Sequence, residues 1–243
     1  MKSLNKKWYF TREYFFPHDC AVCGTMLLTE EETWYGLCDV CRTDLDKETI
    51  DNERCDLCGR PLVSEKIRCL PCRANAETNP PAYDGITALF PYWGKYRKLL
   101  GAFKFGKSLA AGHYLADKLF EALKLLPLEK MIDPVLVPVP PRPGKIRNTG
   151  WDQINSLLKL MKQKNTFFEI VPCLKRKASQ TQKNLDRNNR KTNLKGRIIA
   201  RNAPKNCILF DDVITTGSTM DASAAALKAA GAEKVYGICL FYD

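Results

Sequence analysis

Residues 207–219 read Cys-Ile-Leu-Phe-Asp-Asp-Val-Ile-Thr-Thr-Gly-Ser-Thr, and they give the strongest indication of the fold class. Its first four residues are apolar and predict a buried strand that ends at Asp211 and Asp212. In an open α/β sheet, ligands bind outside the carboxyl ends of the strands. The stretch therefore predicts an α/β protein with a binding site at the end of this strand.

The loop after the acid pair is rich in hydroxyl groups and leads into an Ala-rich helix predicted over 218–230. Its residues are Thr215, Thr216, Gly217, Ser218 and Thr219. The glycine allows a tight turn, and the hydroxyls, free N–H groups and helix dipole favour an anion. Carboxylates suit ribose hydroxyls or Mg²⁺. The acid pair and the loop together therefore predict a site for a phosphorylated ribose. A plain strand–turn–helix would leave two adjacent acids unexplained, and neither the dinucleotide fingerprint nor the P-loop pattern is present.

Strands and helices alternate on both sides of this stretch. Strands are predicted over 82–92, 134–138, 167–174, 207–211 and 235–241, and helices over 96–105, 110–126, 151–162 and 218–230. This alternation indicates a parallel sheet that is covered on both faces. Residues 73–81 are polar and end in two prolines, which is typical of a boundary. We expect one domain over 1–80 and another over 81–243.

The N-terminal part contains four Cys-x-x-Cys pairs. They are Cys20/Cys23, Cys38/Cys41, Cys55/Cys58 and Cys69/Cys72. Four soft thiolates in tetrahedral geometry suit Zn²⁺, with iron–sulfur as the lesser option. The pairs therefore predict two structural four-cysteine sites, with a positive φ expected at Gly24 and Gly59. Sequential pairing is the simplest arrangement, and interleaved pairing stays open. Isolated Cys173, Cys207 and Cys239 are expected to be small buried residues.

The net charge of +11 is concentrated in one segment. Residues 141–205 hold 17 basic and 3 acidic residues, a net of +14, whereas residues 1–80 have a net of −3. Such a concentration indicates a polyanionic partner, a nucleic acid or a phosphate-rich small molecule. The alternative is a solvated basic face. Trp93, Tyr96 and Trp151 lie near basic residues and could stack on bases, although aromatic residues are more often part of the core.

Length and hydropathy narrow the class of protein further. A chain of 243 residues with 45% hydrophobic and 27% charged residues is typical of one or two globular domains. No run approaches the roughly 20 apolar residues of a spanning helix, and residues 1–10 do not resemble a secretory signal. We expect a cytoplasmic protein without membrane insertion, in which cysteines hold metal instead of forming disulfides.

Residues 207–219 match, position by position, the phosphoribosyl-diphosphate (PRPP) motif of type I phosphoribosyltransferases. The four-pair cysteine domain ahead of this motif resembles the ComF family of competence proteins. Residues 137–140 (Val-Pro-Val-Pro), Arg142 and residues 150–153 (Gly-Trp-Asp-Gln) are similar to that family's VPVP…R…G-F-N-Q pattern, with Trp and Asp in place of Phe and Asn. The family's R…Q…L…R…N segment is matched by Arg176, Gln182, Leu185, Arg190 and Asn193.

The resemblance implies a type I phosphoribosyltransferase-like parallel sheet with a small N-terminal double zinc ribbon. It implies that Asp211 and Asp212 hold the ribose hydroxyls and act as the catalytic pair, that residues 215–219 hold the 5′-phosphate, and that Mg²⁺ bridges pyrophosphate and ribose. The candidate for the pyrophosphate loop is 104–107, with Lys104 as its charge contact. The candidate lid or DNA contacts are Arg176, Lys183, Arg187, Arg190 and Lys191. The reaction would be loss of pyrophosphate from C1 of the ribose through an oxocarbenium-like state.

Three functions are compatible with these observations. The resemblance implies a competence protein that handles single-stranded DNA, with other competence proteins, such as a helicase-like protein, as partners. The PRPP motif also suits a phosphoribosyltransferase acting on a nucleobase or an amine. A third possibility is a non-catalytic regulator that senses PRPP.

Overall fold

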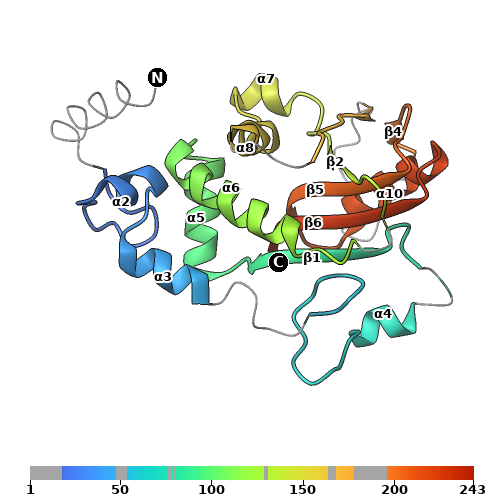
Figure 1. The fold of residues 1–243 in the computed structure, drawn as a ribbon, viewed down its shortest axis with the longest axis horizontal. Coiled ribbons are helices and arrows are strands. Elements are labelled where there is room, and N and C mark those ends of the chain that lie inside the picture. The colour runs from blue at the N-terminus through green and yellow to red at the C-terminus, as the bar shows by residue number, and fades with distance from the viewer. Residues whose placement is uncertain are drawn as a thin grey trace, which may run out of the picture.

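The computed structural model describes residues 18–47, 54–75, 78, 80–128, 131–163, 168–177 and 196–243. Its cysteine-rich part contains α2 (Glu30–Tyr35), α3 (Asp39–Lys47) and α4 (Leu70–Ala74). The rest of the chain runs in the order β1 (Gly85–Pro91), α5 (Gly94–Lys104), α6 (Leu109–Lys124), β2 (Val135–Pro138), α7 (Lys145–Thr149), α8 (Gln153–Lys162), β3 (Leu174–Arg176), β4 (Ile198–Ala200), β5 (Asn206–Ile214), α10 (Ser218–Ala229) and β6 (Lys234–Tyr242). Figure 1 shows these elements around one central sheet. Among the described helices, none is both long and apolar enough to cross a membrane.

The central sheet is parallel and has the strand order β1-β6-β5-β2. Side chains alternate across β5: Ile208 and Phe210 join the cluster formed with α5, α6 and α8, and Cys207 and Leu209 join the cluster formed with α10. Both faces of the sheet are therefore buried, as the near-continuous apolar strands require. The α/β class with a parallel sheet, predicted from the alternation of elements, is confirmed.

Two predictions about strands are corrected. Residues 168–174 do not form a strand of the sheet; Ile170 makes one isolated parallel bridge to Leu136. Pro172 follows closely and has no N–H to continue a ladder, and the chain then pairs β3 with β4 in a separate antiparallel sheet. Phe167 lies outside the described residues.

The second correction concerns the strand that carries the acid pair. β5 continues through Ile214, so Asp211 and Asp212 lie within it and not at its end. Pairing with β2 nevertheless stops at Phe210, whereas pairing with β6 continues to Ile214. The acid pair therefore occupies the point at which β5 loses one of its two neighbours.

Candidate functional site

The eight paired cysteines form two separate clusters. Cys20, Cys23, Cys38 and Cys41 form the first, and Cys55, Cys58, Cys69 and Cys72 form the second; within each, the sulfur atoms lie within 4.8 Å of one another. Sequential pairing, one of two arrangements open from the sequence, is the one adopted. Gly24 and Gly59 have φ angles of 78° and 72°, as expected for the tight turns after the knuckles.

The spacing of the sulfur atoms fits a tetrahedral zinc ion. The Sγ atoms of Cys23 and Cys38 are 3.7 Å apart, as are those of Cys58 and Cys69. A Zn–S bond of about 2.3 Å in tetrahedral geometry separates ligand sulfurs by roughly 3.8 Å. Each cluster thus offers a complete set of four thiolate ligands, which identifies both as structural zinc sites.

The two metal ribbons attach to the sheet domain in different ways. In the first, residues 18–47, Leu37 and Leu45 are fully buried in the cluster formed with α5 and α6. Tyr35 donates a hydrogen bond from its hydroxyl to Asp117 at 2.8 Å, and Trp34 stacks on His113 at 3.9 Å. His113 therefore helps to hold the first ribbon against α6.

The second ribbon, residues 54–75, lies along β1 (Figure 1). It makes backbone contacts there: Arg54 donates to the carbonyl of Leu89 at 3.4 Å, and a Cβ at Gly59 would lie 3.0 Å from the carbonyl oxygen of Ile86. Among its apolar side chains, Leu57 is only partly buried and Val63 is 97% exposed. The second ribbon therefore covers a sheet edge and contributes little to the shared core.

Asp212 is buried and held by groups from two distant segments. Its Oδ2 accepts a hydrogen bond from Gln153 at 2.8 Å and lies 3.2 Å from the ammonium of Lys104. Burial alone would raise the pKa of Asp212, but the charge of Lys104 and the hydrogen bond from Gln153 outweigh it and lower that pKa. Asp212 is thus kept as a carboxylate.

Asp211 has the opposite electrostatic balance. Burial and the neighbouring charge of Asp212 raise its pKa well above the ordinary value, and the backbone N–H of Asp212, which donates to its Oδ1 at 2.8 Å, compensates only in part. Burial and the repulsion between two negative charges both disfavour a carboxylate pair that has only a structural role. Two adjacent carboxylates whose pKa values are displaced in opposite directions are therefore typical of functional sites.

A basic segment reaches the acid pair from the end of β2. Lys145 donates to Oε1 of Gln153 at 2.7 Å, so that a chain of contacts runs from Lys145 through Gln153 to Asp212. Burial lowers the pKa of Lys145, and the two carboxylates partly offset this. Lys145 and Gln153 were not among the site residues predicted from the sequence. Gln153 is the last residue of the Gly-Trp-Asp-Gln stretch, which is the signal that pointed to this place.

Arginines also gather near Asp211. The pKa of Arg176 is lowered by burial and by the charges of Arg142 and Arg197, while Asp211 acts in the opposite direction. Guanidinium groups that repel one another beside a single carboxylate favour an anionic ligand that would bridge them. Of the predicted lid residues, Arg176 is found at the site. Lys183, Arg187, Arg190 and Lys191 lie outside the described residues.

The loop after β5 turns sharply at Gly217, whose φ is 72°, directly ahead of α10. The side chains of Thr216 and Ser218 are linked by a hydrogen bond of 2.8 Å, and both Thr215 and Thr216 are exposed. Gly217, the N-cap residue of α10, makes no side-chain capping bond, but the N–H of Ser218 donates to the Thr216 hydroxyl at 3.4 Å. The helix itself offers no carbonyl partner to the N–H groups of its first turn, which lie at the mouth of the loop. A Cβ at Gly217 would lie 3.4 Å from the Tyr83 hydroxyl in a left-handed conformation, which favours glycine.

Of the aromatic residues considered for stacking, Tyr96 is fully buried and donates to the Leu45 carbonyl at 3.0 Å, so it is unavailable to a base. Trp151 is partly buried, with its ring edge-to-face against Phe103 at 5.7 Å, whereas Trp93 is 62% exposed.

Comparison with known proteins gives matches to both parts of the chain. The double zinc ribbon domain family matches residues 12–74. "Competence protein ComFC" of Streptococcus pneumoniae is 26% identical over 231 residues, covering 89% of this chain and 96% of its own. "Competence protein F" of Haemophilus influenzae is 25% identical over 230 residues, covering 91% and 95%.

Two solved structures also align with this chain; they are HPRT variants, described as a glutamic acid mutant and an asparagine mutant of an invariant aspartic acid. Each aligns with a TM-score of 0.32 and 10% identity over 54% of this chain, which corresponds to 65% of the first structure and 63% of the second. The matches to the two competence proteins over about nine-tenths of the chain, with the double zinc ribbon at its start, confirm the resemblance stated from the motifs: the chain is similar to competence proteins of the ComF type along most of its length.

Proposed function

We propose that this protein acts in natural competence, and that its α/β part binds PRPP with Mg²⁺ at the end of β5. One observation carries the proposal: a buried carboxylate pair, contacted by Lys104 and Gln153, is followed within a few residues by a glycine turn and the N-terminus of α10. PRPP needs these features together, since it joins a ribose diol, a 5′-phosphate and a pyrophosphate in one molecule. We assign the diol and Mg²⁺ to Asp211 and Asp212, and the 5′-phosphate to residues 215–219.

The pyrophosphate would be held by the basic groups that meet at the acid pair. The sequence suggested 104–107 for this role, but the ammonium of Lys104 is engaged with Asp212 at 3.2 Å. Lys145, on the segment that follows β2, interacts electrostatically with both carboxylates, and Arg142, on the same segment, lies near enough to Arg176 to act on its charge. We assign the pyrophosphate to Lys145, Arg142 and Arg176. Lys104 would orient the carboxylate of Asp212 as long as no cation is bound there.

This assignment is tested by calorimetric titration of the zinc-loaded protein with PRPP and Mg²⁺. Asp211→Asn combined with Asp212→Asn should abolish binding while the circular dichroism spectrum stays unchanged. Lys145→Gln should weaken PRPP about tenfold or more, as expected for the loss of one charge-assisted contact. The matched control is Lys234→Gln, at the opposite end of the sheet. Unchanged PRPP affinity in the double aspartate variant would refute the site.

We also propose that the basic segment 141–205 binds single-stranded DNA. Seventeen basic residues against three acidic ones support electrostatic contact with phosphates, which makes binding strongly dependent on salt. Reversing the charges of Arg187, Arg190 and Lys191 should weaken binding of a short oligodeoxynucleotide more than binding of PRPP. Equal loss of both ligands, or of neither, would count against a separate DNA surface.

Turnover distinguishes the remaining alternatives. A phosphoribosyltransferase would release pyrophosphate when PRPP is supplied with a nucleobase or an amine acceptor, whereas a sensor would bind PRPP without releasing it. A coupled pyrophosphate assay across the common bases separates these two functions.

A further inference from the structure

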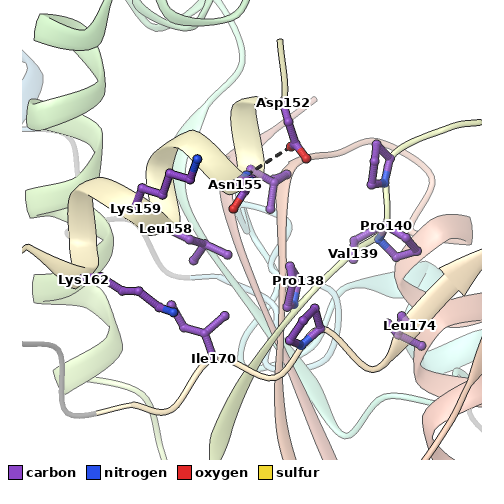
Figure 2. Close-up of a pocket in the computed structure, with 13 residues that line it drawn as sticks. Pro138, Val139, Pro140, Asp152, Asn155, Leu158, Lys159, Lys162, Ile170 and Leu174 are labelled. Carbon is purple, nitrogen blue, oxygen red and sulfur yellow. Dashed lines mark hydrogen bonds between the residues drawn. The ribbon is translucent and has the colours of Figure 1, made fainter. Parts of the chain in front are cut away.

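A cavity of about 450 Å³ lies on the outer side of β2, away from the acid pair. It is bounded by the chain that leaves β2, by one face of α8 and by the segment that ends at Leu174 (Figure 2). Neither the acid pair nor residues 215–219 line it. The cavity is therefore distinct from the site proposed for PRPP, although the two share a boundary.

That boundary is the first turn of α8. Asp152 and Ile154 line the cavity, whereas Gln153 between them turns to the other side and donates to Asp212. The carboxylate of Asp152 accepts the backbone N–H of Asn155 at 3.1 Å, so it is engaged in capping the helix (Figure 2). Its negative charge is thus offset by the helix N-terminus.

The cavity floor is apolar and rigid. Four prolines contribute to it, namely Pro138, Pro140, Pro141 and Pro172, together with Leu158 and Ile170. A proline ring fixes the backbone at its own position, so the floor is largely preformed, and a preformed site loses little entropy on binding. The volume is within the usual range of about 300–1,000 Å³ for small-molecule sites.

The wall opposite the prolines is basic. Lys159 and Lys162 extend from α8 along it (Figure 2), and within the described part of the chain neither has an ion-pair partner. Asn155 stands one turn before Lys159 on the same face, since residues three and four apart share a helix side. Two uncompensated ammonium groups beside a proline floor match an anion that carries a flat, weakly polar ring.

We propose that this cavity is a second ligand site and that it binds a nucleoside phosphate, with the ring on the prolines and the phosphate on Lys159 and Lys162. Inorganic phosphate would leave the apolar floor unused, and an uncharged ring would leave the lysines unused. The ligand could be a free nucleotide or one nucleotide of a DNA strand, because both present the same chemistry. The proposal does not depend on PRPP binding.

The test is calorimetric titration of the full zinc-loaded protein with AMP, with and without saturating PRPP and Mg²⁺. We expect one AMP site that persists in the presence of PRPP and in the Asp211→Asn/Asp212→Asn variant. Lys159→Gln with Lys162→Gln should weaken AMP about tenfold, and Asn155→Trp, at an exposed position, should block the cavity without disturbing the core. Lys234→Gln is the matched control for charge.

Further probes separate the ligand classes. Adenosine and inorganic phosphate should each bind at least tenfold more weakly than AMP. Octanoate that binds as well as AMP would refute a ring site. If the lysine variants also weaken binding of a ten-residue oligothymidylate, and AMP competes with that oligonucleotide, the natural ligand is a nucleotide of a DNA strand. If the variants weaken only the binding of AMP, the natural ligand is a free nucleotide. The proposal would be overturned if PRPP displaced AMP, or if the lysine variants left the binding of AMP unchanged.

Discussion

The cysteine clusters and the acid pair each hold ionisable groups of one kind close together. They differ in what compensates the negative charge of these groups. Each cysteine cluster brings four thiols within reach of one zinc ion, whose positive charge comes from outside the chain and offsets part of the thiolate charge. The acid pair is compensated by Lys104 and Gln153 of the same chain, and only Asp212 benefits fully. The clusters are therefore built for stability, whereas the acid pair retains an unfavourable charge that a ligand can relieve.

The largest effect is expected from breaking the first zinc site. Cys38→Ser should lower the free energy of unfolding by about 4 kcal/mol or more, because metal binding is coupled to folding and this ribbon shares its core with α5 and α6. Thermal unfolding followed by circular dichroism, with zinc quantified per chain, measures the effect. An unchanged melting temperature with one zinc lost would show that the ribbon does not support the core.

A smaller effect is expected at the second site. Cys58→Ser should also remove one zinc per chain but lower the free energy of unfolding by only about 2 kcal/mol, since this ribbon contacts β1 mainly through backbone groups. The two serine variants are matched controls for each other. A larger loss for Cys58→Ser than for Cys38→Ser would reverse our ranking of the ribbons.

The next prediction concerns Lys104, the cation of this chain that compensates the charge of Asp212. Lys104→Met should lower the free energy of unfolding by about 2 kcal/mol at pH 7, because Asp212 then keeps a buried charge without its partner. The cation holds the pKa of Asp212 below its ordinary value, so its contribution is lost as the pH falls through that lowered pKa. Urea unfolding of both proteins at pH 7 and pH 3 tests this, and a difference that does not shrink at low pH would contradict it.

The smallest predicted effect has the opposite sign. Asp211→Asn should raise the free energy of unfolding by about 1 kcal/mol near neutral pH, because it removes a buried carboxylate with a raised pKa. A raised pKa in the folded state means that the wild type loses stability as the pH rises above about 4, the ordinary pKa of aspartate. Unfolding in urea at pH 5 and pH 8 should show the gap widening with pH. A less stable variant at pH 8 would contradict the prediction.

The predictions from sequence succeeded where the signal is local. A Cys-x-x-Cys knuckle and its glycine involve a few consecutive residues, so both metal sites were predictable from spacing. Predictions were incomplete where contacts join distant segments. Lys104 reaches Asp212 across 108 positions and Gln153 across 59, and neither separation leaves a periodic pattern. The pairing of β3 with β4 was missed because Leu174 and Ala200 meet only through tertiary structure.

The early departure of β2 from β5 has a consequence for aggregation. Beyond Phe210 the strand has β6 on one side only, and an open strand edge is a template for pairing with another chain. The carbonyl of Phe210 still accepts from Val139 on the β2 side, and two residues on, on the same side, the N–H of Asp212 already donates to the carboxylate of Asp211 at 2.8 Å. The acid pair thereby occupies a donor that a foreign strand would need. The residues that we assign to ligand binding thus also protect the sheet from intermolecular strand addition.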